Sequence, residues 1–279
     1  MTGSTAGPMT TPTPPTPTVG VLLRQWRGHR RRSQMDLALD VGVSTRHLSF
    51  IETGRANPSA EVVLALAEGL DVPLRERNHL LLAAGYAPRY EETPLDAPAM
   101  ARARDAVQRI LDAHDPYPGV VLDRRWDVVA ANAGALALID GVAPELAAPT
   151  LNVFRVSLHP DGLAARTRNF EEWGSYLVWQ LERQLALSGD ESLAALLEEV
   201  RTYPNVAALP RRTPESDPAL VLTVDIADPD LSFFTTLTTF GTPRDITLDE
   251  LMIELFYPAD DATARHLGRQ GIAARSAET

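Results

Sequence analysis

The sequence contains no cysteine and no lysine, so all 26 of its basic residues are arginine. Without thiols the chain forms no disulfides and no thiolate metal sites, which fits a reducing compartment. No apolar run approaches the roughly 18 residues of a membrane span, and the N-terminus lacks a charged segment followed by a hydrophobic one. We therefore expect a soluble cytoplasmic protein that does not contact a membrane.

Patterns typical of enzymes are missing as well. There is no glycine-rich phosphate loop and no His-Glu-x-x-His motif. Asp260 and Asp261 follow Pro258 in an arrangement typical of a helix N-cap, and we favour that interpretation over a pair of metal ligands. The sequence predicts a protein that is not an enzyme, with no catalytic residues, no metal site and no cofactor.

Charge is divided unequally along the chain, whose formal net charge is −11. Residues 19–90 contain ten arginines and seven acidic residues, a net charge of +3, and residues 1–18 are uncharged. This leaves −14 for residues 91–279. A basic module of this kind can use attraction to phosphates, while an acidic partner domain discourages indiscriminate binding.

Composition also divides the 279 residues into segments. Residues 1–18 hold five prolines and seven threonines, which predicts a disordered tail. Helical spacing of apolar residues predicts a five-helix domain over 19–86, and the prolines of 87–97 indicate a linker. A second domain is expected over 98–268, and a flexible tail over 269–279.

Residues 33–59 predict two short helices joined by a tight turn. Ser33, followed three residues later by Asp36, resembles a capping box. Gly42 can end the first helix with a positive φ, and Ser44 can cap the second. Such a helix-turn-helix places its second helix in the major groove of double-stranded DNA.

The second helix presents an apolar face and a polar face. Leu48 and Ile51 are three residues apart and point inward. The opposite face mixes a guanidinium, hydroxyls and a phenyl ring, which can contact guanine, phosphates and the thymine methyl group. Adding Gln34 at the preceding helix start and two residues beyond the second helix, our candidates for DNA contact are Gln34, Ser44, Thr45, Arg46, Ser49, Phe50, Arg55 and Asn57.

This stretch resembles the lambda-repressor-like, Xre-type family. The resemblance rests on Gln34, Leu37, Ala38, Gly42, Val43, Ser44, Ser49, Ile51, Glu52, Gly54, Arg55, Pro58 and Ser59. It implies that Gln34 and Arg55 contact the DNA backbone, and that Arg27 of the preceding helix pairs with Glu52. The run Arg30 to Arg32 has two interpretations, favourable charge at a helix C-terminus or contact with phosphate.

The C-terminal part changes character near Pro116 and mixes helices with strands. Helices are expected at about 98–114, 133–139, 161–187 and 191–202, followed by a proline-rich loop over 204–218. Alternating or β-branched runs predict five strands, in one antiparallel sheet, at 120–122, 126–130, 220–226, 231–240 and 250–257.

This half resembles the ligand-binding domain of MmyB-like transcription regulators, whose sensor domain is PAS-like. The most specific match runs from Leu231 through Phe233 and Phe234 to Asp245, closing on Tyr257 to Asp260. The resulting fold class is multidomain, an all-α five-helix helix-turn-helix domain followed by an α+β PAS-like domain with a five-stranded antiparallel sheet. The family implies a small, largely apolar ligand, plausibly similar to a fatty acid.

Aromatic residues concentrate in this half and are interspersed with arginines. An apolar cavity with one arginine at its mouth would suit a fatty carboxylate, whereas plain core packing with surface arginines is the simpler interpretation of any single residue. The candidates for ligand contact are Trp126, Asn132, Phe154, Phe170, Trp173, Phe233 and Phe234.

Two functions follow from these patterns. The first is a sequence-specific transcription regulator that binds operator DNA as a homodimer and responds to a small apolar ligand. The dimer is expected because one recognition helix covers only a few base pairs. The second is a DNA-binding interaction module whose C-terminal domain binds a protein partner and no small molecule.

Overall fold

The chain forms two compact units that divide between Glu91 and Glu92. The structure is a computed structural model that describes residues 17–188, 190–210, 223–227 and 229–277. Much of the predicted N-terminal tail, residues 1–16, lies outside the described residues. No helix of the described chain is long and apolar enough to cross a membrane.

The first unit confirms the predicted helices and their caps. Ser33 Oγ accepts a hydrogen bond from the Asp36 amide at 3.1 Å, and Ser44 Oγ accepts one from the His47 amide at 3.1 Å. Gly42 has the expected left-handed conformation, with φ of 73°. The five helices are α1 (Val19–His29), α2 (Gln34–Val41), α3 (Thr45–Glu52), α4 (Ala60–Gly69) and α5 (Leu74–Ala83).

Helix α3 lies directly against α1. A Cβ atom at Gly20 would lie only 2.1 Å from the Ile51 carbonyl oxygen, so only glycine permits this approach. Leu23 of α1 and Leu48 of α3 are fully buried in the shared core. The recognition helix is therefore held by backbone-close packing as well as by its cap.

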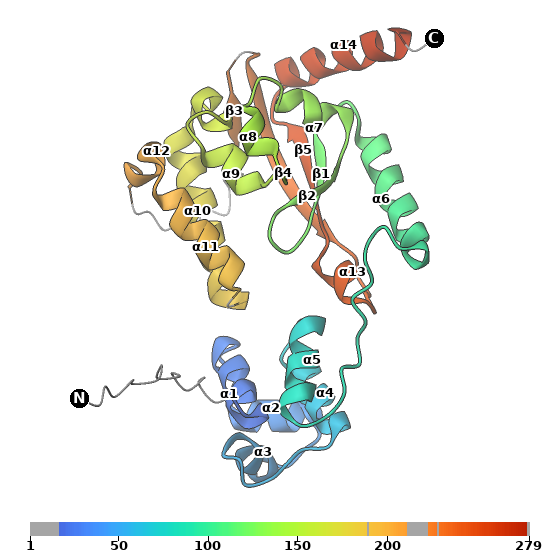
Figure 1. Ribbon diagram of the computed structural model, residues 1–279, viewed down its shortest axis with the longest axis vertical. Helices are drawn as coiled ribbons and strands as arrows, with labels where there is room; N and C mark the ends of the chain where they lie inside the picture. The colour runs from blue at the N-terminus through green and yellow to red at the C-terminus, as the bar shows by residue number, and fades with distance from the viewer. Residues whose placement is uncertain (1–16, 189, 211–222, 228, 278–279) are drawn as a thin grey trace, which may run out of the picture. The chain divides into compact units, whose positions relative to one another are not determined.

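The second unit is built on one antiparallel sheet in the order β2-β1-β5-β4-β3, which confirms the predicted fold class (Figure 1). β5 lies at the centre and pairs with β1 on one side and β4 on the other. The strands are β1 (Gly119–Leu122), β2 (Val128–Ala131), β3 (Val224–Ile226), β4 (Leu231–Thr239) and β5 (Met252–Pro258).

Helices cover both faces of this sheet. α6 packs on one face, where Leu111 and Ile253 share a core, and α9, α10 and α11 cover the other (Figure 1). The helical segments are η1 (Pro98–Met100), α6 (Ala101–His114), α7 (Ala133–Leu138), α8 (Pro144–Ala147), α9 (Val153–Leu158), η2 (Leu163–Arg166), α10 (Phe170–Ser188), α11 (Glu191–Arg201), α12 (Pro204–Ala207), α13 (Ile246–Glu250) and α14 (Asp261–Ala277).

Some strand boundaries differ from those predicted. The strand expected at 126–130 begins at Val128, because Trp126 has φ of 65° and belongs to the turn. Glu250 ends α13, so the last strand begins at Met252. Of the strand expected at 220–226, residues 220–222 lie outside the described residues.

Helix boundaries differ more. The helix expected over 161–187 is divided into η2 and α10, and Thr167 between them is extended. The loop expected over 204–218 begins with α12, and its residues 211–218 lie outside the described part. The tail expected from residue 269 is helical to Ala277, because its alanines and arginines are good helix formers.

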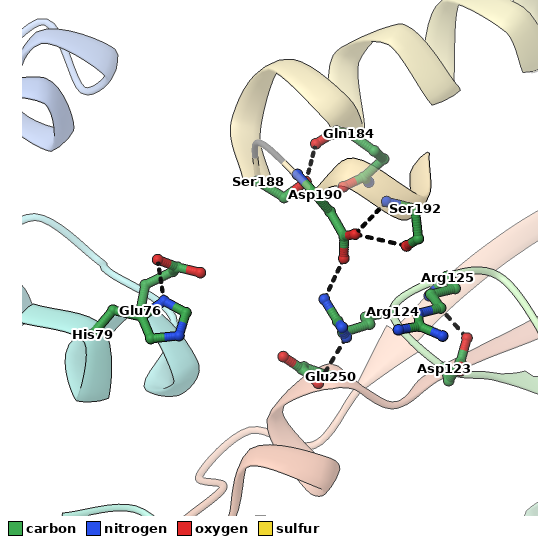
Figure 2. A network of polar contacts seen from close by, with 10 residues as sticks. All are labelled: Glu76, His79, Asp123, Arg124, Arg125, Gln184, Ser188, Asp190, Ser192 and Glu250. Carbon is green, nitrogen blue, oxygen red and sulfur yellow. Dashed lines mark hydrogen bonds and ion pairs between the residues drawn. The ribbon is translucent and has the colours of Figure 1, made fainter. Parts of the chain in front are cut away.

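Arg124 ties the β1–β2 turn to two other segments (Figure 2). Its guanidinium forms an ion pair with Asp190, the N-cap of α11, and its Nε lies 3.8 Å from a carboxylate oxygen of Glu250 at the end of α13. Asp190 also accepts a hydrogen bond from the Ser192 amide at 2.8 Å. These contacts join the hairpin to the helical layer beside it.

Candidate functional site: a recognition helix and an apolar cavity

Helix α3 presents the predicted DNA-facing side chains together. Thr45 and Arg46 are exposed, whereas Ser49 and Phe50 are half-buried. The Arg46 guanidinium lies over the Phe50 ring at 5.2 Å from its centroid. Because the two residues are four apart on one helix, the ring limits the rotamers of Arg46. Sequence reasoning placed both residues on this face but missed their contact, which the spacing itself signals.

The remaining candidates occupy the ends of α2 and α3. Ser44 is exposed, and its hydroxyl is engaged in capping α3. Arg55 and Asn57 are exposed in the segment that follows α3. Gln34 is half-buried, and its side-chain amide donates to Glu52 at 2.7 Å. Gln34 thus has a structural role within the domain in addition to any contact with phosphate.

Arg27 and Glu52 form the internal pair that the family resemblance implies. Arg27 Nε and Nη2 donate to the two Glu52 oxygens at 2.7 and 2.9 Å, and the Glu52 side chain is only 2% exposed. Burial raises the pKa of Glu52, but hydrogen bonds from Arg27 and Gln34 outweigh it and hold the pKa below the ordinary 4.5. A carboxylate on the helix that is predicted to face DNA is thereby neutralised internally.

Two arginines of the run before α2 make contacts within the domain. Arg30 donates to the carbonyl oxygens of Leu70 and Asp71 at 2.8 and 2.7 Å. Arg32 forms an ion pair with Asp40. Both interpretations of this run missed a third role, because Arg30 and Arg32 contact groups within the domain.

In the second unit, two adjoining cavities lie between the sheet and its helical layer. Their volumes are about 60 and 40 Å³. Residues from β5, α7, α9 and the segments beside them line both cavities, so the two cavities adjoin. The shared lining consists of Leu138, Val153, Ser157, Leu163, Glu254 and Phe256.

Glu254 is the acidic residue of this lining. It lies on the central strand β5, and its side chain faces the same side of the sheet as Met252 and Phe256, which pack against the larger core. The residue is 6% exposed, and burial raises the pKa of its carboxyl group to about 7, against a smaller opposing effect of a hydrogen bond from Thr235. Glu254 is not among the residues that the sequence indicated for ligand contact, although it lies in the strand expected at 250–257.

The seven aromatic and amide candidates are distributed over several places. Trp126 and Trp173 line the smaller cavity. Phe154 and Phe233 are fully buried in the core around it, and Phe170 packs at the edge of that core.

The other two candidates have structural roles. Asn132 caps α7, accepts from the Gly119 amide at 2.9 Å and donates to the Tyr117 carbonyl at 2.8 Å, so it has no polar atom to offer a ligand. Phe234 lies on the opposite face of the sheet from Phe233 and stacks on Tyr257, with ring centroids 5.3 Å apart.

Arginine does not line the cavities in the described part of the chain, and neither does histidine. Two arginines near these aromatic residues in the sequence have other partners. Arg155 pairs with Glu199 at 2.7 Å, and Arg168 pairs with Asp230 at 2.5 Å. The expected arginine at the cavity mouth is therefore replaced by an acidic group within the cavity.

Asp260 is the N-cap of α14, as the sequence indicated. Its carboxylate accepts a hydrogen bond from the Thr263 amide at 2.7 Å. Within the residues that the structure describes, no group of three or more His, Asp or Glu side chains is arranged to hold a metal ion.

Comparison with solved structures gives distant similarities. One is the clp gene regulator ClgR from Corynebacterium glutamicum, with 24% identity over 37% of this chain and 99% of that chain, and a TM-score of 0.22. Another is an RNA-binding light-oxygen-voltage receptor, with 16% identity over 92% of this chain and 59% of that chain, and a TM-score of 0.27. Both TM-scores are too low to support an argument. No curated protein matched the chain.

Two protein families match the chain directly. Residues 18–80 match a helix-turn-helix domain, which coincides with the five-helix unit. Residues 103–269, more than half of the chain, match the MmyB-like transcription regulator ligand binding domain. The match spans the sheet, the helical layer and both cavities. The chain therefore belongs to the MmyB-like transcription regulators, with a helix-turn-helix joined to the ligand-binding domain of that family.

Proposed function

We propose that this regulator binds a specific operator sequence through α3 and that a small apolar ligand in the second unit changes its affinity for that operator. The observation that carries the proposal is the pair of adjoining apolar cavities inside the family's ligand-binding domain. Ligand sites are usually concave and mostly apolar, with a small number of polar groups, as these cavities are. The alternative, a domain that binds only a protein partner, needs no internal cavity.

We call the helix-turn-helix unit the reader and the ligand-binding unit the sensor. Within the reader, we assign Arg46 to a contact with a base and Arg55 to a contact with a phosphate. Arg46 lies on the exposed face of α3 and is oriented by Phe50, which suits a bidentate contact with guanine. Arg55 is exposed in the turn after α3, where backbone contacts fix the register of a recognition helix.

Replacing each of these arginines by alanine should weaken DNA binding in different ways. Arg46→Ala should reduce the free energy of operator binding by ~1–3 kcal/mol and relax the sequence preference at one operator position, because a base contact carries sequence information. Arg55→Ala should weaken all sequences alike and reduce the salt dependence. The measurement is titration of an operator panel at two salt concentrations. Equal, sequence-independent losses in both variants would contradict the assignment of Arg46.

We also propose that the operator-bound form is a homodimer, because two readers on half-sites about one helical turn apart add their binding energies. The same titrations give the stoichiometry, for which we expect two chains per operator. One chain bound to a single, unrepeated half-site would exclude the dimer.

The cavities favour a ligand with an apolar body. Leucine, valine and phenylalanine side chains supply most of the shared wall. Each cavity alone is much smaller than the roughly 300 Å³ of a typical ligand site, so binding requires the side chains between them to change rotamer. The similarity to a fatty acid rests on the family resemblance and concerns the apolar chain.

The connection between the units is anchored at both ends. On the reader side, Asn78 holds Tyr90 by accepting from its amide and donating to its carbonyl, at 3.0 and 2.8 Å. On the sensor side, Asp245 beside α13 accepts from the Thr93 amide at 3.1 Å. A ligand that shifts the sheet and α13 can therefore act on the reader through very few intervening residues.

Filling the cavity should abolish ligand control of DNA binding. A decyl-chain compound that favours one arrangement of the units should change operator affinity by about 5–150-fold, and operator DNA should change ligand affinity by the same factor. Ala135→Leu places a larger side chain in the lining of the larger cavity and should remove the effect. Ala137→Leu, two residues along α7 and exposed, is the matched control.

The measurement is tryptophan fluorescence during ligand titration, with and without operator, alongside mass spectrometry of an organic extract of the denatured protein. Binding that is identical with and without DNA would keep the ligand and remove the switch. No binding of any alkyl compound, and no extractable molecule, would favour the protein-partner function instead.

A further inference from the structure

Glu254 lies in the middle of the ligand-binding domain, with an unsatisfied oxygen. In the sheet it stands between Val120 of β1 and Leu237 of β4. Its side chain lines both cavities, yet Oε2 is buried and has no hydrogen-bond partner. Buried polar atoms without partners are rare, because each costs free energy that folding must offset elsewhere.

No arginine or histidine of the described residues lines the cavities around Glu254. The described lining of the two cavities is apolar apart from hydroxyl and indole groups such as those of Ser157, Thr167 and Trp126. The Thr167 hydroxyl already donates to the Leu163 carbonyl at 2.9 Å. Tyr176 of α10 is affected by charges on both sides: burial and the Glu254 charge raise the pKa of its phenol, and the Arg183 charge lowers it by less.

We propose that Glu254 is the polar anchor of the cavity, and that its ligand is an apolar molecule whose end carries a hydrogen-bond donor, a hydroxyl or an amino group, in place of a carboxylate. This inference rests on the proposed ligand-binding function and specifies its chemistry. The donor satisfies Oε2, while the alkyl or ring portion occupies the space between the leucine, valine and phenylalanine side chains.

Charge explains why a carboxylate is disfavoured. An anion beside Glu254 would be a second acidic group in an apolar cavity that offers no cation, so one of the two would have to bind a proton. A hydroxyl can both donate and accept, and it therefore suits the protonated and the ionised carboxyl group. An ammonium group donates only, and it pairs with the ionised form in a charge-assisted hydrogen bond.

The test compares three probes of equal chain length with the purified full chain: 1-decanol below its solubility limit, and decylamine and decanoate below their micelle concentrations, all at pH 8. We expect decanol and decylamine to bind about tenfold or more tightly than decanoate. Decanoate donates no hydrogen bond to Glu254, so Oε2 stays unsatisfied beside a second negative charge. Lowering the pH from 8 to 6 should weaken decylamine binding by protonating Glu254, with little effect on decanol. These measurements need no variant.

Glu254→Gln then isolates the carboxyl group. It should weaken decylamine binding by about tenfold or more, remove the pH dependence and strengthen decanoate binding, while decanol changes least. Glu172→Gln, the same substitution at an exposed position of α10, should leave all three affinities unchanged.

Two results would overturn the inference alone: decanoate that binds wild type as tightly as the other probes, or affinities that Glu254→Gln leaves unchanged. Absence of binding by all three probes, with nothing extractable from the protein, would overturn the proposed ligand-binding function itself.

Discussion

Glu52→Ala should unfold a measurable fraction of the helix-turn-helix unit and abolish operator binding. The substitution leaves the Arg27 guanidinium, 18% exposed, without its carboxylate partner. Breaking a buried ion pair from one side costs about 3–5 kcal/mol, which is much of the stability of a small domain. Hydrogen exchange in the full chain measures this directly, because amides of α1 and α3 should lose protection while those of the sheet keep theirs.

The Glu182–Arg201 pair provides the matched control. Both of its side chains are almost half exposed, at 45% and 44%, so Glu182→Ala should cost no more than about 1 kcal/mol. Replacing Arg27 and Glu52 together by leucine should recover much of the lost stability, since no unpaired charge remains buried. Equal losses of stability in Glu52→Ala and Glu182→Ala would show that the buried Arg27–Glu52 pair stabilises the protein no more than an exposed ion pair does.

The same pair predicts acid sensitivity of the reader. The pKa of Glu52 in the folded state is lower than the ordinary 4.5, so its contribution to stability is complete above that value and is lost as pH falls through the folded-state pKa. Protection of α1 and α3 should therefore decline below about pH 4.5, and it should decline less in the double-leucine variant.

Glu254→Gln should stabilise the ligand-binding unit increasingly as pH rises. The folded-state pKa of Glu254 is about 7 and its ordinary value is 4.5, so the folded state binds a proton that the unfolded state releases. The contribution of this bound proton to the stability of the unit is complete below pH 4.5 and is lost as pH rises through 7. That difference corresponds to about 3 kcal/mol at most, since each pH unit is worth about 1.4 kcal/mol.

The measurement is urea unfolding of the second unit, followed by the fluorescence of its tryptophans between pH 4 and 9. The quantity of interest is the stability of Glu254→Gln minus that of wild type, because other titrating groups cancel in the difference. It should rise between about pH 4.5 and 7 and then level off. A constant difference, like the one expected for exposed Glu172→Gln, would mean that Glu254 ionises freely in the folded protein.

The sequence by itself determined the reader almost completely. Ser33 and Ser44 each cap the helix that they were expected to cap, and Gly42 ends α2 with a positive φ. These features depend on residues within four positions of one another, so local chemistry decides them. The Arg27–Glu52 pair joins distant positions, and the family resemblance, rather than any local pattern, supplied it.

Tertiary structure decided which side chains surround the cavity. Phe233 and Phe234 are neighbours of similar chemistry, yet one is buried in the core and the other stacks on Tyr257 across the sheet. Asn132 looked equally available for a ligand, but its bonds to Gly119 and Tyr117 occupy it. Strand register assigns every second residue to one face, and a shift of one residue reverses the assignment. Glu254 faces the cavity for this reason, and only the pairing of β5 with β1 and β4 reveals an acidic group enclosed among apolar side chains.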